Sequence, residues 1–187
     1  DVMRTNLSAL VAEAFGADCP SLRVAAHLPY YITTDVLTKL MRELPQAQSI
    51  AVMIQKEVGD KLLSSPGEDG YGPLAVMCQY HYNVVRALDV PAACFNPPPK
   101  VDSSFMVLER LETPYVDGGD EAVFTRLVRS AFAMRRKTLL NNLISGFALN
   151  REQAASYLEA VGLSVQARAE ELSLEDFAKL SRQLQSL

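Results

Sequence analysis

Hydrophobic residues in the first part of the chain follow two spacings in alternation. Some stretches place them with the helical period, and others are unbroken apolar runs, the pattern of buried strands. Gly16 is expected to end the first helix, and Thr33 and Thr34 to cap the second. This alternation predicts a parallel sheet covered by helices on both faces. The predicted order is helix 6–15, strand 22–26, helix 33–44, strand 49–54 and helix 56–63.

The pattern changes along the second part of the chain. A loop rich in turn-forming residues precedes a helix, and two segments with β-branched residues and a period near two follow. After Gly118 and Gly119 every apolar segment has the helical period. We therefore predict an α/β domain over residues 1–113 and a small all-α domain over residues 120–187. Residues 74–82 could form a helix or a strand, and a helix is favoured because their apolar residues share one helical face. The other elements are loop 64–73, strands 83–90 and 103–111, and helices 121–132, 136–147, 151–161 and 174–184.

Composition narrows the class of protein. No apolar run reaches the length of about eighteen residues that a membrane span needs, and the first residues do not resemble a secretory signal. Cys19, Cys78 and Cys94 are scattered, odd in number and without metal-binding spacing. That usage favours a reducing compartment over a disulfide framework or a zinc site. We expect a cytoplasmic globular protein without a membrane partner.

Charge is unevenly distributed along the chain. The formal net charge is −4, yet residues 122–151 contain six basic side chains and no acid, so this window carries +6 and the remainder −10. Such segregation is typical of a surface that binds phosphates, although an ordinary solvated helix face has the same pattern. The basic residues are Arg126, Arg129, Arg135, Arg136, Lys137 and Arg151.

Three stretches carry candidate chemistry. AAHLPYYITTDVL lies where a predicted strand ends and a helix begins, and it presents Tyr30 for stacking on a flat base; the alternative is an ordinary loop with a buried tyrosine. CFNPPPKVDS places Phe95 on a proline-stiffened ledge, where Lys100 and Asp102 can form an anchoring ion pair. FAMRRKTLLNNL is expected to be helical, with its basic cluster facing solvent or phosphate.

Taken in order, these strings resemble the ribosomal RNA adenine dimethyltransferase family, and its housekeeping small-subunit branch in particular. The matching strings are LPYYIT, QKEV, YGPLAVMCQY, FNPPPKVDS, FAMRRKTLLNNL and RAEELSLEDFAKL, which span nearly the whole chain. The resemblance implies the carboxy-terminal part of a Rossmann-like methyltransferase domain followed by a small helical RNA-binding domain. It also implies S-adenosylmethionine as cofactor, and N6-dimethylation of two adjacent adenines near the 3′ end of small-subunit RNA.

The resemblance also assigns roles by position. Tyr30 and Phe95 would sandwich a flipped adenine, and residue 27 and the Leu28–Pro29 backbone would accept hydrogen bonds from its N6 amine. Asp1 and His27 would lie against the cofactor, with Asp1 accepting from the cofactor's adenine amino group. The basic cluster is our choice for RNA phosphate contacts, through Arg135, Arg136 and Lys137.

Two features depart from the family pattern. His27 stands where the family has asparagine, and an imidazole accepts one hydrogen bond only while it is neutral. We expect weakened or pH-dependent catalysis; the alternative is a tolerated variant. The family's glycine-rich loop and acidic ribose-binding residue lie upstream of Asp1, so the chain is expected to lack the front of the cofactor site, to bind cofactor poorly alone, and to self-associate through the open edge of strand 22–26.

The sequence is compatible with two other functions. A non-catalytic RNA-binding ribosome-assembly factor on the same scaffold would bind small-subunit RNA or a 30S-type particle without methyl transfer. A macrolide-resistance methylase would act on large-subunit RNA, but FNPPPKVDS and RRKTLLNNL disfavour that branch.

Overall fold

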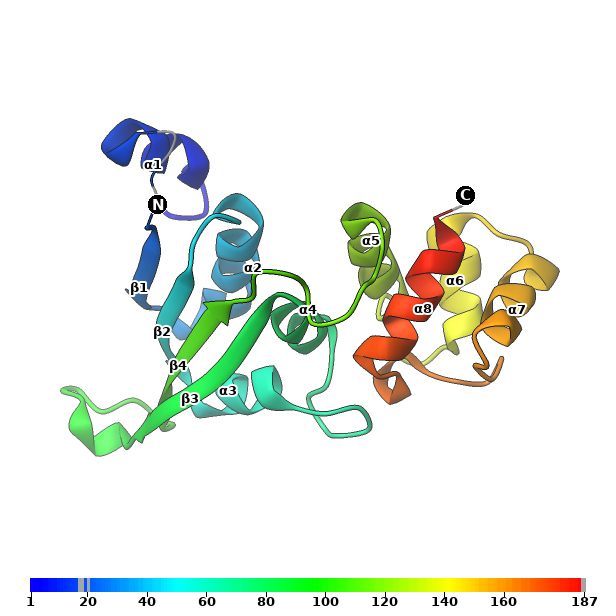
Figure 1. The fold of residues 1–187 in the computed structure, drawn as a ribbon. Coiled ribbons are helices and arrows are strands. Elements are labelled where there is room, and N and C mark those ends of the chain that lie inside the picture. The colour runs from blue at the N-terminus through cyan, green and yellow to red at the C-terminus, as the bar shows by residue number, and fades with distance from the viewer. Residues whose placement is uncertain (17–18, 20, 186–187) are drawn as a thin grey trace. The chain divides into compact units, whose positions relative to one another are not determined.

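The computed structural model describes residues 1–16, 19 and 21–185. The chain forms two compact units, of which the first contains Asp1–Leu63 and Tyr82–Leu111, and the second contains Ser64–His81 and Glu112–Leu187 (Figure 1). The predicted boundary at residues 113–120 lies close to the last division. Residues 64–81, however, were expected in the first domain and pack with the helical unit, because Tyr71, Val76 and Tyr80 belong to its core cluster.

A four-stranded sheet forms the first unit, in the order β1-β2-β4-β3 (Figure 1). Its strands are β1 (Arg23–His27), β2 (Ser49–Gln55), β3 (Tyr82–Val90) and β4 (Ser103–Arg110). The predicted parallel pairing is confirmed for β1 and β2 only, since β4 pairs antiparallel with both β2 and β3. β3 and β4 are joined directly by residues 91–102 without a crossover helix, and such a connection requires antiparallel strands.

The first strand is not buried, contrary to expectation. Within the part of the chain that the structure describes, β1 pairs only with β2, and its residues alternate between exposed and half-buried. β2 lies inside the sheet, and there Ile50, Val52 and Ile54 are completely buried. The apolar run of residues 22–26 correctly predicted a strand but wrongly predicted that it is buried, because burial depends on the strands and helices that flank it. The open edge predicted for this strand is present.

Three helices accompany the sheet: α1 (Leu7–Phe15), α2 (Thr33–Glu43) and α3 (Lys56–Leu63). Asn6 caps α1 by accepting a hydrogen bond from the Ala9 N–H, at 3.0 Å, and α1 ends at Gly16 as predicted. The predicted threonine cap of α2 is wrong. A 3-10 turn over Tyr30–Ile32 runs straight into α2, so the Thr33 hydroxyl instead donates backwards to the Pro29 carbonyl, at 3.1 Å.

The second unit is built around one apolar core. Its helices are α4 (Pro73–His81), α5 (Glu121–Ala131), α6 (Leu139–Phe147), α7 (Arg151–Ala160) and α8 (Leu174–Leu184). Tyr80 of α4 stacks on Phe124 of α5 with ring centroids 3.8 Å apart, and the Tyr71 hydroxyl donates to the Leu172 carbonyl at 2.9 Å. These contacts explain why residues 64–81 join the helices. None of the helices among the described residues has the length and apolar character to cross a membrane.

Candidate functional site

His27 and Phe95, far apart in the sequence, come together at the carboxyl end of β1. His27 is the last residue of that strand, and Phe95 directly follows a 3-10 turn over Ala92–Cys94. Their rings stack with centroids 6.0 Å apart and planes 28° apart. His27 is exposed and Phe95 half-buried, so flat apolar surface remains open to solvent. Together with Tyr30 we call these residues the aromatic ledge.

The carbonyls of the two residues after β1, Leu28 and Pro29, differ in whether a described group donates to them. The Leu28 N–H donates to the Met53 carbonyl at 3.2 Å and so extends the pairing of β1 with β2. The Pro29 carbonyl accepts both the Ile32 N–H, at 3.2 Å, and the Thr33 hydroxyl, at 3.1 Å. Among the described residues, nothing donates to the Leu28 carbonyl. Of the two carbonyls predicted to accept from a base, only that of Leu28 is therefore unoccupied.

Tyr30 is fixed by a residue that the sequence did not single out. Its hydroxyl makes a hydrogen bond of 2.7 Å with the hydroxyl of Ser103, which is completely buried at the start of β4. This bond fixes the far end of the side chain and so the direction in which the ring extends. A serine pair opening an otherwise apolar strand, Ser103 and Ser104, was the available sequence signal, since buried hydroxyls need partners.

The loop that carries Phe95 is anchored through Asp102. Its carboxylate accepts a hydrogen bond from the Ala92 N–H at 2.9 Å, and its carbonyl accepts from the Lys56 N–H at 3.0 Å. The anticipated ion pair with Lys100 is not formed; Lys100 is exposed and pairs with no acid among the described residues. Asp102 therefore anchors the loop by binding backbone rather than a cation.

A second anchor lies at the base of the same hairpin. Asp89 accepts a hydrogen bond from the Ser104 hydroxyl at 2.5 Å and pairs with the Lys56 ammonium at 3.1 Å. The Ser104 hydroxyl, followed by Lys56, lowers the pKa of Asp89 below its usual range. This carboxylate stays charged and joins β3, β4 and the start of α3 beneath the loop that carries Phe95.

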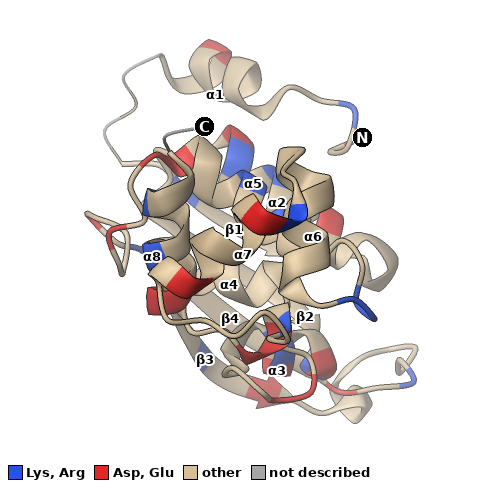
Figure 2. Ribbon diagram, turned by 90° about the vertical axis from the view of Figure 1, so that its right-hand side faces the viewer, with Lys and Arg blue, Asp and Glu red and all other residues tan. Residues whose placement is uncertain are grey.

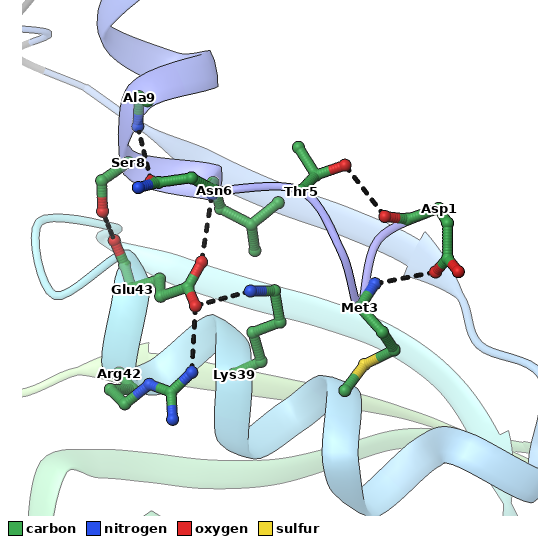
Figure 3. Close-up of polar contacts among 10 residues, drawn as sticks. Asp1, Met3, Thr5, Asn6, Ser8, Ala9, Lys39, Arg42 and Glu43 are labelled. Atoms are coloured by element: carbon green, nitrogen blue, oxygen red, sulfur yellow. Dashed lines mark hydrogen bonds and ion pairs between the residues drawn. The ribbon is translucent and has the colours of Figure 1, made fainter.

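Asp1 lies in a turn that is held to α2 through Glu43 (Figure 3). Its carboxylate is largely exposed and accepts a hydrogen bond from the Met3 N–H at 2.9 Å. Glu43 accepts from the Leu7 N–H at 3.1 Å and from the Lys39 ammonium at 2.5 Å. Lys39 first, then the Leu7 N–H and Arg42, lower the pKa of Glu43 to about 2. No contact within the described part of the chain joins Asp1 to His27.

The basic cluster lies in a loop, not on a helix as predicted. α6 begins at Leu139, and Arg135, Arg136 and Lys137 are exposed in the preceding residues 132–138, which we call the basic loop. Asn142 of α6 is buried, and its amide donates to the carbonyls of Ala131, at 2.6 Å, and Met134, at 3.4 Å. These hydrogen bonds end α5 and bend the chain, which sequence periodicity could not reveal.

Charge on the helical unit follows the predicted distribution. In Figure 2 blue lies on α5, blue and red both lie on α8, and α6 has no charged residue. None of the three cations of the basic loop forms an ion pair with a described residue. The described residues also contain no group of three or more His, Cys, Asp and Glu side chains placed to hold a metal ion. Burial raises the pKa of the Cys78 thiol to about 12, so this cysteine is chemically inert.

Solved structures with the same fold are RNA methyltransferases. A dimethyladenosine transferase from Plasmodium falciparum superposes with a TM-score of 0.69 at 23% identity, over 84% of this chain and 65% of that one. The 23S rRNA methyltransferase ErmE superposes with a TM-score of 0.63 at 20% identity, over 97% of this chain and 79% of that one. The fold is therefore that of Rossmann-like RNA methyltransferases.

The family follows from the sequence comparisons. Residues 1–186 match the family model described as ribosomal RNA adenine dimethylase, and the chain belongs to this family. It is 40% identical to ribosomal RNA small subunit methyltransferase A of Geobacillus thermodenitrificans and 39% identical to that of Clostridium acetobutylicum, over 100% and 98% of this chain. The chain spans 64% of the length of each of these relatives.

Proposed function

We propose that the chain carries the adenine-binding and RNA-binding parts of an enzyme that dimethylates adenine N6 in small-subunit ribosomal RNA. The observation that carries this proposal is the aromatic ledge beside the unoccupied Leu28 carbonyl. A base must leave its stack before its N6 can be reached, and an aromatic surface at the end of a strand offsets that cost. Family membership supports the same substrate.

The ledge residues act by orienting the base. Phe95 and Tyr30 offer ring faces, and the hydrogen bond between Tyr30 and Ser103 holds one of those rings in place at its far end. The Leu28 carbonyl and a neutral His27 nitrogen accept from the N6 amine, which directs the nitrogen lone pair away from them. Orientation of this kind is the enzyme's main contribution when the reagent itself is reactive.

S-adenosylmethionine supplies an activated methyl group when it is bound. The residues present here fit part of its binding site, because the exposed Asp1 carboxylate has further acceptor positions beyond the one that Met3 occupies. Asp1 would accept from the cofactor's adenine amino group. The Asp1 carbonyl accepts hydrogen bonds from the Arg4 and Thr5 N–H groups, which close the turn, and Glu43 holds the start of α1 that follows it.

The basic loop would hold the RNA. Its three cations, Arg135, Arg136 and Lys137, form no ion pair with a described residue and suit phosphate contacts that position RNA without reading its sequence. The substrate we propose is a small-subunit ribosomal particle with two adjacent adenines near the RNA 3′ end, which places the protein in the cytoplasm with the ribosome.

The open edge of β1 supports a further proposal, that the isolated chain self-associates. An unpaired strand edge is a template for pairing with another strand, and exposed Leu10 and Phe15 of α1 add apolar surface to the same unit. Sedimentation at increasing concentration should show association, which Ala25→Lys in β1 should reduce. A chain that stays monomeric at every concentration contradicts this.

The identity of residue 27 distinguishes an enzyme from an RNA-binding factor on the same scaffold. We expect His27→Asn to raise the methyl-transfer rate and to remove its decline at acid pH, because an imidazolium no longer accepts a hydrogen bond. The measurement is the rate across pH for the two proteins. Equal rates of the unmodified protein and His27→Asn at every pH would contradict the proposed effect of His27.

Labelled methyl transfer to undermethylated small ribosomal subunits tests the proposed function. Two proteins are compared: this chain, and a hybrid in which the part of the Geobacillus relative upstream of the matched region is joined ahead of Asp1. We expect dimethyladenosine from the hybrid and little or none from the chain alone. A hybrid that folds and binds the particles yet transfers no methyl group overturns the enzyme proposal and leaves a non-catalytic assembly factor.

A further inference from the structure

An open hollow of about 650 Å³ lies between α5 and α6, outside both the ledge and the basic loop. Its lining comes from the basic window of residues 122–151, with Glu121 directly before that window. The lining residues are Glu121, Ala122, Thr125, Arg126, Arg129, Ser130 and Gly146. Two arginines one helical turn apart therefore face a polar concavity.

Arg126 is held in place on two sides. Its guanidinium donates two hydrogen bonds to the Gly146 carbonyl, from Nε at 3.1 Å and from a terminal nitrogen at 2.8 Å. The same group lies over the Phe147 ring, 4.5 Å from its centroid. A guanidinium has five N–H donors, so those not bound to Gly146 remain for a ligand. Such a preorganised fork loses little conformational freedom when it binds an anion.

The arrangement of Arg126 depends on a close approach of the two helices. A Cβ atom on Gly146 would collide with the side chain of Ser130, so α5 and α6 can pack this tightly only with glycine there. The contact brings the Gly146 carbonyl within reach of Arg126 and leaves the Ser130 hydroxyl on the wall of the hollow. Gly146 therefore determines the shape of the hollow, and the arginines determine its charge.

The remaining lining groups favour an anion. Arg129 is exposed and makes no ion pair among the described residues, and the hydroxyls of Thr125 and Ser130 add neutral donors. The acid in the lining is Glu121 at the start of α5, which lies 3.4 Å from the His81 imidazole. The basic window of residues 122–151, free of acids, surrounds these groups in sequence.

We propose that this hollow, which we call the arginine hollow, binds a backbone phosphate of the RNA through Arg126 and Arg129. It would be a second phosphate site beside the basic loop. Planar guanidinium groups match phosphate oxygens in pairs, and held arginines give an RNA helix a fixed orientation. The inference rests on the proposed function, because it names a further contact of the same RNA.

Binding of a labelled RNA hairpin from the 3′ end of small-subunit RNA, measured by fluorescence anisotropy across a series of KCl concentrations, tests this site. Two variants of the 187-residue chain are compared with the unmodified chain: Arg126→Gln with Arg129→Gln, and the charge-matched control Arg151→Gln with Lys179→Gln. We expect the hollow variant to bind about tenfold more weakly. Its salt slope should fall by roughly 0.7–0.9, the amount that the loss of one phosphate contact removes. The control should keep the slope of the unmodified chain.

Arg129→Gln alone guards against a folding defect, because Arg129 makes no bond to other described residues; it should lower the slope by about half as much. An unchanged slope in the hollow variants, or an equal loss in the control, overturns the inference. If the hollow variant binds whole ribosomal particles more weakly but binds naked RNA normally, the hollow contacts a ribosomal protein, and this result also overturns the inference. If the unmodified chain binds no RNA, the proposed function itself is contradicted.

Discussion

The aromatic ledge and the basic loop are held by opposite means. In the ledge the functional side chains themselves are fixed, since the Tyr30 hydroxyl is bound to buried Ser103 and the Phe95 ring lies against His27. In the basic loop the backbone is fixed, by the Asn142 amide, while the cations extend into solvent. Stacking on a flat base requires a ring held in place, whereas a phosphate requires only nearby charge. The two kinds of anchoring fit these two demands.

This contrast predicts separable defects. Changes in the ledge should slow methyl transfer by the hybrid without weakening RNA binding, because a flipped base contributes little to the total phosphate-dominated affinity. Changes in the basic loop should weaken RNA binding and leave the rate intact once RNA is saturating.

The largest effect is expected for Phe95→Ala. Loss of one stacking ring costs about 1–3 kcal/mol, which corresponds to a rate decrease of roughly 5- to 150-fold. The measurement is single-turnover methyl transfer by the hybrid at saturating RNA. Tyr31→Ala is the matched control, because Tyr31 is 85% exposed and lies beside Tyr30. Equal losses in the two variants would show that Phe95 has no special role.

The next effect is expected for neutralising the basic loop. Changing Arg135, Arg136 and Lys137 together to glutamine should lower the salt slope of RNA binding by about 2–3 and the affinity by at least about tenfold. Anisotropy titrations at several KCl concentrations measure both quantities. A slope equal to that of the unmodified chain would rule these residues out as phosphate contacts.

A smaller effect is expected where Tyr30 is anchored. Tyr30→Phe keeps the ring and removes its hydrogen bond to Ser103, worth about 0.5–1.5 kcal/mol, so the rate should fall roughly two- to tenfold. Ser103→Ala should act through the same bond, and the double variant should be no slower than either single one. Additive losses would mean that the two residues act separately.

The smallest effect concerns the turn that carries Asp1. The pKa of Glu43 is lowered to about 2, so its stabilising contribution is present above the ordinary carboxyl pKa of about 4.3 and is lost as pH falls from there toward 2. Glu43→Gln should therefore be less stable near neutral pH, with the difference shrinking on acidification. Urea unfolding at several pH values measures this, and the Leu7 amide resonance should titrate over the same range. A stability difference that does not change with pH contradicts the assignment.

The spacing of apolar residues predicted the ends of a helix well where residues adjacent in the sequence determine them. The limits of α3 and α8 agree with the prediction, because each follows an abrupt change of spacing, and the Ser173 side chain caps α8. Burial of β1 could not be predicted, since it depends on which strands flank it. The start of α6 depends on the Asn142 side chain reaching back to Ala131, a tertiary contact with no periodic signal.

The candidate site was predicted only in part. The motifs identified His27, Tyr30 and Phe95, and the structure brings His27 and Phe95 together. The predicted sandwich between Tyr30 and Phe95 stays a prediction, as do the cofactor contacts of Asp1. The hydrogen bonds of Ser103 with Tyr30 and of Asp102 with the Ala92 N–H could not be predicted from the sequence. Each joins residues that only the folded chain brings together, and no sequence spacing encodes such a contact.

Single-turnover methyl transfer by the hybrid, measured over a range of RNA concentrations, tests the separation of the two regions most directly. We expect Phe95→Ala to stay slow at saturating RNA, whereas the triple variant of the basic loop should reach the rate of the unmodified hybrid. If saturating RNA restores Phe95→Ala, or leaves the triple variant equally slow, the division between a base-orienting ledge and a phosphate-binding loop is contradicted.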